Sequence, residues 1–200
     1  MAAGGPIEPL WALYQQHKTG KVMEILATLR IGSLSAEEAA EEVDVEDPYH
    51  TDPERHPALV VQKDKPFNAE TPQELIPDTL ITSNELFFVR HHHPVPVVDA
   101  EEYRLGVEGK GVPRPRRLSL EDIKALPKHT VTTTMQCAGN RRSEYDKHGK
   151  VMGLPWGIGA ISTATWSGAR LADVLAAAGL SREDAERAGV EHIQFEAMDP

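Results

Sequence analysis

The sequence has 200 residues, of which 40% are hydrophobic, so it is long enough to bury a core in one or two domains. Its single cysteine, Cys137, excludes an internal disulfide and any zinc site built from several thiolates. No apolar run reaches the ~20 residues of a membrane-spanning helix, and neither GxGxxG nor a phosphate-binding glycine loop is present. We expect no membrane or nucleic-acid partner.

Residues 1–32 form a short leader with its own helical pattern. Apolar residues recur at helical spacing between Gly20 and Gly32, and Gly32 is placed to end that helix. A second apolar stretch precedes it and is followed by His17. About 30 residues cannot bury enough surface to fold alone, so we expect the trailing part of a domain whose beginning is absent.

Residues 33–56 carry most of the net charge of −10, with nine acidic residues against one arginine. A segment this acidic, with few apolar residues, repels itself and is typical of a solvated linker. We therefore predict a flexible hinge here. The helical propensity of AEEAAEE favours the alternative, a surface helix.

Residues 57–200 alternate strand and helix signals without the regular rhythm of a parallel sheet, which predicts an α+β fold. We expect a strand at 103–109, a helix capped by Ser119 that stops before Pro127, a strand at 130–137 and a helix at 168–180. In the second strand, Val131, Thr133 and Met135 share one side.

Cys137 follows that strand within MQCAGNRRSE and has three possible roles: a nucleophile, a metal ligand or a small buried hydrophobe. Base rates favour the buried hydrophobe. Arg141 and Arg142 favour the thiolate, which is the form that attacks electrophiles and binds metals.

The segment FFVRHHHPVP is the other polar cluster. In an extended chain, His91 and His93 share one face, and Arg90 and His92 share the other. A polar strand edge is the simplest interpretation, because single histidines form hydrogen bonds more often than they bind metals.

Four segments resemble one family in the order that the family has them: GGPIEPLWALY, FFVRHHHPVP, TVTTTMQCAGNRRSE and GAISTATWSGARLADVL. The chain resembles animal-type sulfite oxidases over nearly its whole length. The resemblance implies that residues 57–200 are the first part of a molybdopterin-binding domain of mixed α+β fold. It also implies an enzyme that oxidises sulfite to sulfate by oxygen-atom transfer at a molybdenum-pterin centre.

The resemblance also assigns site residues. Cys137 corresponds to the cysteine whose thiolate binds molybdenum, which suits a soft metal ligand. The cofactor-lining residues correspond to Phe88, Val89, Arg90, His91 and His92, with Asp199 as a further cofactor contact. Arg90 would also bind the sulfite anion, because guanidinium offers paired, permanently charged donors. His91 departs from the asparagine expected at its position.

By the same resemblance, residues 1–32 are the C-terminal remnant of a cytochrome b5-like haem domain. His17 would be one axial haem ligand, and its partner ligand is missing from the sequence; on the residues alone it is a surface histidine. The acidic hinge would let the haem domain pass electrons from molybdenum onward to cytochrome c. The family also implies a homodimer in the mitochondrial intermembrane space.

Two other functions are compatible with the residues. Assimilatory nitrate reductases share the CAGNRR motif, but they place the haem domain after the molybdenum domain and usually continue with KE where this chain has Ser143 and Glu144. The chain could also be a fragment that acts only as a folding or interaction module. Missing ends favour that alternative, and Arg90 and Cys137 do not exclude it.

Overall fold

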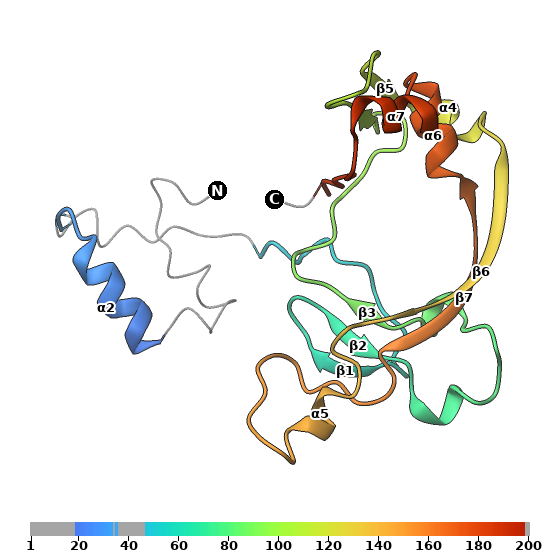
Figure 1. Cartoon of the computed structure of the whole chain (residues 1–200). Helices are drawn as coiled ribbons and strands as arrows, with labels where there is room; N and C mark the ends of the chain where they lie inside the picture. The colour runs from blue at the N-terminus through green and yellow to red at the C-terminus, as the bar shows by residue number, and fades with distance from the viewer. Residues whose placement is uncertain (1–18, 34, 36–46, 199–200) are drawn as a thin grey trace. The chain divides into compact units, whose positions relative to one another are not determined.

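The computed structural model describes residues 19–33, 35 and 47–198, and the chain divides into two compact units, Met1–His50 and Thr51–Pro200 (Figure 1). The predicted roles of His17 and Asp199 therefore concern residues outside the described part, as does half of the predicted hinge. The division into a leader at 1–32, a hinge at 33–56 and a molybdopterin-binding part at 57–200 stays a prediction. No helix of the described part is long and apolar enough to cross a membrane.

The first unit contains helix α2, Gly20–Thr28, which confirms the helix predicted in the leader. Thr19 caps its N-terminus by accepting the N–H of Val22. The helix ends before Gly32, the predicted stop, because the hydroxyl of Thr28 donates to the carbonyl of Ile25 and Leu29 closes the last turn.

The second unit is α+β, as predicted, and all its strand pairs are antiparallel. Its elements are β1 (Val60–Lys63), β2 (Asn68–Glu70), η2 (Gln73–Leu75), η3 (Asn84–Leu86), β3 (Val89–Arg90), β4 (Leu105–Val107), β5 (Arg116–Leu118), α4 (Leu120–Lys124), β6 (Lys128–Gln136), α5 (Arg142–Tyr145), β7 (Ile161–Ala169), α6 (Leu171–Ala177) and α7 (Arg182–Ala188).

A three-stranded sheet in the order β1-β2-β3 lies at one end of this unit. Its core consists of Leu59, Ala69 and Val89, with Phe67 packed against them. All three residues of the central strand β2 are buried, although Asn68 and Glu70 are polar. A buried polar side chain is stable only with hydrogen-bond partners, so β2 must hold other parts of the fold.

Strands β6 and β7 form a long two-stranded ribbon with uninterrupted pairing from Lys128↔Ala169 to Gln136↔Ile161. Figure 1 shows the ribbon curving from the helical end of the unit to the β1–β3 sheet. One face carries hydroxyl pairs such as Thr132–Thr165, with the two oxygens 2.9 Å apart. Val131 and Met135 lie on the opposite face, as the predicted alternation requires. The β6 strand therefore confirms the prediction for residues 130–137.

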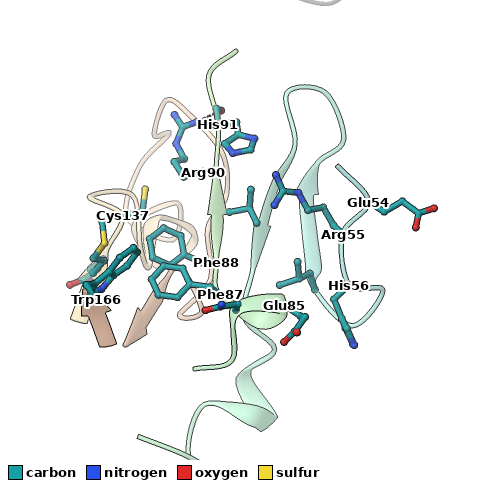
Figure 2. Close-up of a pocket in the computed structure, with 15 residues that line it drawn as sticks. Glu54, Arg55, His56, Glu85, Phe87, Phe88, Arg90, His91, Cys137 and Trp166 are labelled. Atoms are coloured by element: carbon teal, nitrogen blue, oxygen red, sulfur yellow. Dashed lines mark hydrogen bonds between the residues drawn. The ribbon is translucent and has the colours of Figure 1, made fainter. Parts of the chain in front are cut away.

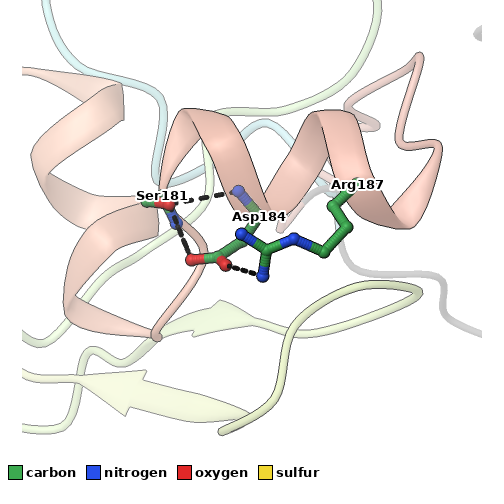
Figure 3. Close-up of polar contacts among 3 residues, drawn as sticks. All are labelled: Ser181, Asp184 and Arg187. Atoms are coloured by element: carbon green, nitrogen blue, oxygen red, sulfur yellow. Dashed lines mark hydrogen bonds and ion pairs between the residues drawn. The ribbon is translucent and has the colours of Figure 1, made fainter.

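The other end of the ribbon meets β4–β5 and the short helices. Ser119 and Asp122 form the N-terminal capping box of α4, which confirms the predicted start of that helix. Gly179 follows α6, also as predicted. Ser181 and Asp184 form a second capping box at α7, and Arg187 pairs with Asp184 at 3.1 Å (Figure 3). Helices α4 and α7 thus begin at local polar contacts.

Candidate active site

Cys137 lies in a tight turn directly after β6, and backbone hydrogen bonds fix its position. Its N–H donates to the carbonyl of Ala160 at 2.9 Å, and its carbonyl accepts the N–H of Asn140 at 2.9 Å. The side-chain oxygen of Asn140 accepts the N–H of Ala160 at 3.0 Å, which closes the turn against the segment before β7. The thiol is free and half-buried, and its sulfur accepts the N–H of Gly139 at 3.4 Å.

The turn continues through Arg141, which has a φ of 66° and a ψ of 18° in the left-handed region. That region is costly for a residue with a side chain. It is held by the N–H of Arg141, which donates to the carbonyl of Gly157 at 2.6 Å. The next residue but one, Ser143, donates its N–H to the carbonyl of Trp156 at 3.0 Å. The cysteine turn is therefore hydrogen-bonded to residues 156–160 along its whole length.

The guanidinium groups of Arg141 and Arg142 both have partners in the protein, and their predicted effect on the thiolate of Cys137 stays a prediction. Arg141 forms an exposed two-pronged ion pair with Glu144, with a closest distance of 2.7 Å. Hydrogen bonding to Glu144 raises the pKa of Arg141. Arg142 donates to the carbonyl of Leu154 at 2.9 Å and packs so tightly on Gly139 that a Cβ there would meet its guanidinium at 2.7 Å. The Arg142 side chain therefore packs on the cysteine turn, whereas the exposed ion pair of Arg141 contributes little to its stability.

Glu70 of β2 anchors the segment to which the cysteine turn is bonded. Its side chain is only 3% exposed, and its carboxylate accepts the N–H of Gly157 at 2.5 Å and the N–H of Gly159 at 2.7 Å. It also accepts a hydrogen bond from Gln62 at 2.8 Å. Charge-assisted hydrogen bonds of this kind are about twice as strong as neutral ones. The carboxylate therefore fixes residues 157–159, which in turn fix the Cys137 turn.

Arg90 is positioned by the other polar residue of β2, Asn68. The Asn68 side-chain oxygen accepts a hydrogen bond from the Arg90 guanidinium at 3.0 Å and from the N–H of His91 at 3.1 Å. Arg90 also reaches the His92 ring, at 2.7 Å from Nε2, which confirms that Arg90 and His92 share one side. A second anchor lies at Phe88, whose N–H donates to the buried hydroxyl of Ser162 on β7 at 3.1 Å.

Cys137 and Arg90 line one cavity of about 600 Å³, shown in Figure 2. Its wall comes from the residues before β1, from η3 and β3, and from the end of the β6–β7 ribbon. Three aromatic rings form part of it: Phe87 stacks on Phe88 with centroids 5.3 Å apart, and Trp166 meets Phe87 edge-on at 5.9 Å. The volume lies within the usual range for small-molecule sites.

The structure places the predicted residues Phe88, Val89, Arg90, His91 and Cys137 on this wall. His92 contacts Arg90 but is not part of the lining. The histidine run does not create a metal site, because no group of three or more His, Cys, Asp or Glu side chains suited to one occurs within residues 19–33, 35 and 47–198.

Sequence reasoning missed several lining residues, namely Glu54, Arg55, His56, Leu59, Asn84, Glu85, Phe87, Met135, Gln136 and Trp166. Trp166 could have been found from the strand register, because it pairs with Val131 and so lies on the same face as Met135. Arg55 was hidden in the acidic stretch assigned to the hinge, although the structure places Thr51–His56 in the second unit.

Two residues of the cavity lining each carry a buried polar atom without a hydrogen-bond partner, Nε of Arg55 and Nδ1 of His91. Burial lowers the pKa of His91, and the nearby Arg55 and Arg90 lower it further, whereas Asp52 raises it. His91 is therefore neutral at physiological pH, with one ring nitrogen as donor and the other as acceptor.

Comparison with known proteins identifies the family of the chain. Residues 92–200 match the family model described as the oxidoreductase molybdopterin binding domain. The chain belongs to this family. It is 52% identical to a sulfite oxidase from Gallus gallus over 200 residues, which is 100% of this chain and 43% of that protein. A mitochondrial sulfite oxidase from Rattus norvegicus is 50% identical over 100% of this chain and 36% of its own length.

The chain thus spans well under half the length of these relatives. Among solved structures, the sulfane dehydrogenase SoxCD from Paracoccus pantotrophus matches with a TM-score of 0.51 and 23% identity, over 82% of this chain and 41% of that one. This likeness supports the shared fold. The molybdopterin-binding fold predicted from the sequence is confirmed.

Glu70→Gln should destabilise the second unit by about 2 kcal/mol, because an amide nitrogen would face a backbone N–H that the carboxylate now satisfies. Urea unfolding measures the change in the free energy of unfolding. Glu74→Gln, an exposed change in the following turn, is the matched control. Equal midpoints for the two variants would show that the carboxylate does not anchor residues 157–159.

Stability should also depend on the protonation of His91. Because its pKa in the folded state is lowered below the ordinary 6.5, the unfolded chain takes up the proton first as the pH falls. The contribution to stability is present above pH 6.5 and is lost as the pH falls toward the lowered value. Melting temperatures at about pH 7.5 and about pH 5.5 should differ less in His91→Asn than in the parent protein. The exposed His192→Asn should leave that difference unchanged.

Proposed function

We propose that this chain forms part of the catalytic centre of a sulfite oxidase, a molybdenum-dependent oxidoreductase that converts sulfite to sulfate. The observation that carries the proposal is the thiol of Cys137 and the guanidinium of Arg90 on the wall of one cavity. A soft sulfur ligand and a permanent cation are the two groups that a metal-centred reaction of an oxyanion requires. The similarity to sulfite oxidases over the whole chain supports this assignment.

The residues fit a molybdenum-pterin cofactor. Cys137 presents a free thiol whose sulfur accepts only a long hydrogen bond at 3.4 Å among the described contacts, so it is available as a metal ligand. Phe88, Val89, Arg90, His91 and His92 would hold the organic part, together with Asp199. When bound, the cofactor supplies oxygen-atom transfer and accepts electrons from the substrate. A haem held by His17 would belong to the whole protein.

The chain's own residues bind and orient the substrate. Arg90 carries its charge into the cavity while Asn68 and the carbonyl of His91 fix its guanidinium at 3.0 and 2.5 Å. Because the guanidinium is already fixed, its side chain loses little conformational entropy when sulfite binds. The aromatic rings of Phe87, Phe88 and Trp166 exclude water from one side, which strengthens the attraction between Arg90 and the anion.

The whole protein's setting is proposed from its relatives. The mitochondrial sulfite oxidase of rat supports a mitochondrial location, and we further propose the intermembrane space, cytochrome c as the electron acceptor and a homodimer. Sulfite-dependent reduction of cytochrome c by the full-length protein carrying this sequence tests the activity. Nitrate serves as the control substrate. Reduction of nitrate without oxidation of sulfite would favour a nitrate reductase instead.

Cys137→Ser should lower sulfite turnover by orders of magnitude, because the sulfur ligand is lost. The side-chain volume hardly changes, so the free energy of unfolding should fall by only about 1 kcal/mol. Sulfite turnover and molybdenum per chain are measured together in the full-length protein. Full turnover in this variant would show that the thiol is only core filling.

Arg90→Gln should leave molybdenum per chain near normal and raise the Michaelis constant for sulfite about tenfold or more, because the anion loses a charged partner. Arg182→Gln, an exposed arginine on α7, is the matched control. An unchanged Michaelis constant would remove Arg90 from the anion site.

A further inference from the structure

Two residues of the cavity lining each carry a buried polar atom that has no hydrogen-bond partner: Nε of Arg55 and Nδ1 of His91. An unsatisfied buried polar group destabilises the fold, so native proteins rarely keep one without a reason. Both atoms belong to residues that line the same cavity, and in Figure 2 the Arg55 guanidinium points toward the His91 ring. The unsatisfied atoms therefore form one feature.

Arg55 is held in place by the protein even though its Nε is unpaired. Its guanidinium carbon lies 6.0 Å from the centroid of the Phe67 ring, within the range of a cation–π contact. The following residue, His56, closes a turn by accepting the N–H groups of Ala58 at its ring and of Leu59 at its carbonyl, both at 3.1 Å. This turn leads into the core at Leu59, so the position of Arg55 is defined before any ligand binds.

His91 is equally well positioned. Its N–H and its carbonyl both bond to the Asn68 side chain, at 3.1 and 3.0 Å. The backbone is therefore fixed, and only the ring is left to make a further contact. Because burial and the two neighbouring arginines keep the ring neutral, its nitrogens offer one donor and one acceptor.

The chemistry of the pair defines what it can bind. Arg55 can only donate hydrogen bonds, whereas a neutral His91 can donate or accept at Nδ1. A planar ring edge with a carbonyl oxygen beside a ring N–H satisfies both groups at once. A free oxyanion offers only acceptors, so it would satisfy the donors of Arg55 and His91 but not the acceptor nitrogen of His91. Arg90 already provides a cation for such an anion.

We propose that Arg55 is a cofactor-binding residue that acts with His91 to hold the carbonyl-bearing edge of the pterin ring. The inference rests on the proposed function and deepens it by adding a contact from the segment before β1. Arg55 and His91 thus bind the organic part of the cofactor, while Arg90 binds the substrate anion.

The test is retention of the pterin by the full-length protein carrying this sequence. Pterin per chain is measured by fluorescence after oxidative release, following gel filtration in parallel with the parent protein. Arg55→Gln should lower the retained pterin about tenfold, because both its charge and its donor fork are lost. Arg55→Lys, which keeps only the charge, should give an intermediate value. Arg182→Gln should retain the parental amount.

A melting curve of the cofactor-free protein shows whether Arg55→Gln weakens the fold. If it does, two variants of His91 provide an independent test. His91→Leu removes the ring nitrogens and should lose pterin, whereas His91→Asn restores a donor and an acceptor and should retain it. This rescue distinguishes hydrogen bonding to the cofactor from simple packing.

Three results would overturn the inference. Parental retention in Arg55→Gln, together with parental sulfite oxidation, would refute it and leave the proposed function intact. A raised Michaelis constant for sulfite with parental pterin would place Arg55 in the anion site instead. If the parent protein itself held no pterin and oxidised no sulfite, the proposed function would fail, and this inference with it.

Discussion

The carboxylate of Glu70, buried between β2 and the segment before β7, is the interaction on which the site depends. It binds the N–H groups of Gly157 and Gly159 across a sequence separation of nearly 90 residues. Those residues are the partners of the cysteine turn, so the carboxylate determines where the sulfur lies relative to the sheet. A neutral acceptor would bind the same N–H groups more weakly.

Strand β2 links both halves of the cavity although it is only three residues long. Asn68 holds the segment of Arg90 and His91, Glu70 holds the segment that positions Cys137, and Ala69 between them is fully buried in the core. The two polar side chains therefore place cation and thiol relative to one common element. Arg90 and Cys137 are 47 positions apart in sequence and line one cavity. Arg90 is bonded directly to this strand, whereas Cys137 is bonded to the segment that Glu70 holds.

The sequence predicted those elements whose cause is local. Strand β6, the capping box at Ser119 and the helix before Gly179 follow from alternation, a cap and a glycine, and all three are present. The β1–β3 sheet was missed because its strands are only two to four residues long and its central strand is buried by distant partners. No periodicity can reveal a polar residue whose partners lie far along the chain.

The candidate site was likewise predicted only in part. Arg90 and Cys137 were found through motif resemblance, whereas Arg55 was not, because composition made its acidic neighbourhood look like a linker. The role proposed for Arg55 rests on its place in the cavity lining and on the buried, unpartnered Nε. The predicted effect of Arg141 and Arg142 on the sulfur stays a prediction; the structure shows their side chains bonded to Glu144 and to the carbonyl of Leu154.

The left-handed backbone of Arg141 has a consequence for which residues this position can tolerate. Its side chain is exposed and its carboxylate partner is equally at the surface, so charge contributes little to the fold. The conformation is the stronger constraint. Glycine or asparagine would enter it at low cost, whereas valine or isoleucine would resist it and draw the chain away from the carbonyl of Gly157. Variation at position 141 should therefore follow backbone preference rather than charge, even beside the anion site that we propose.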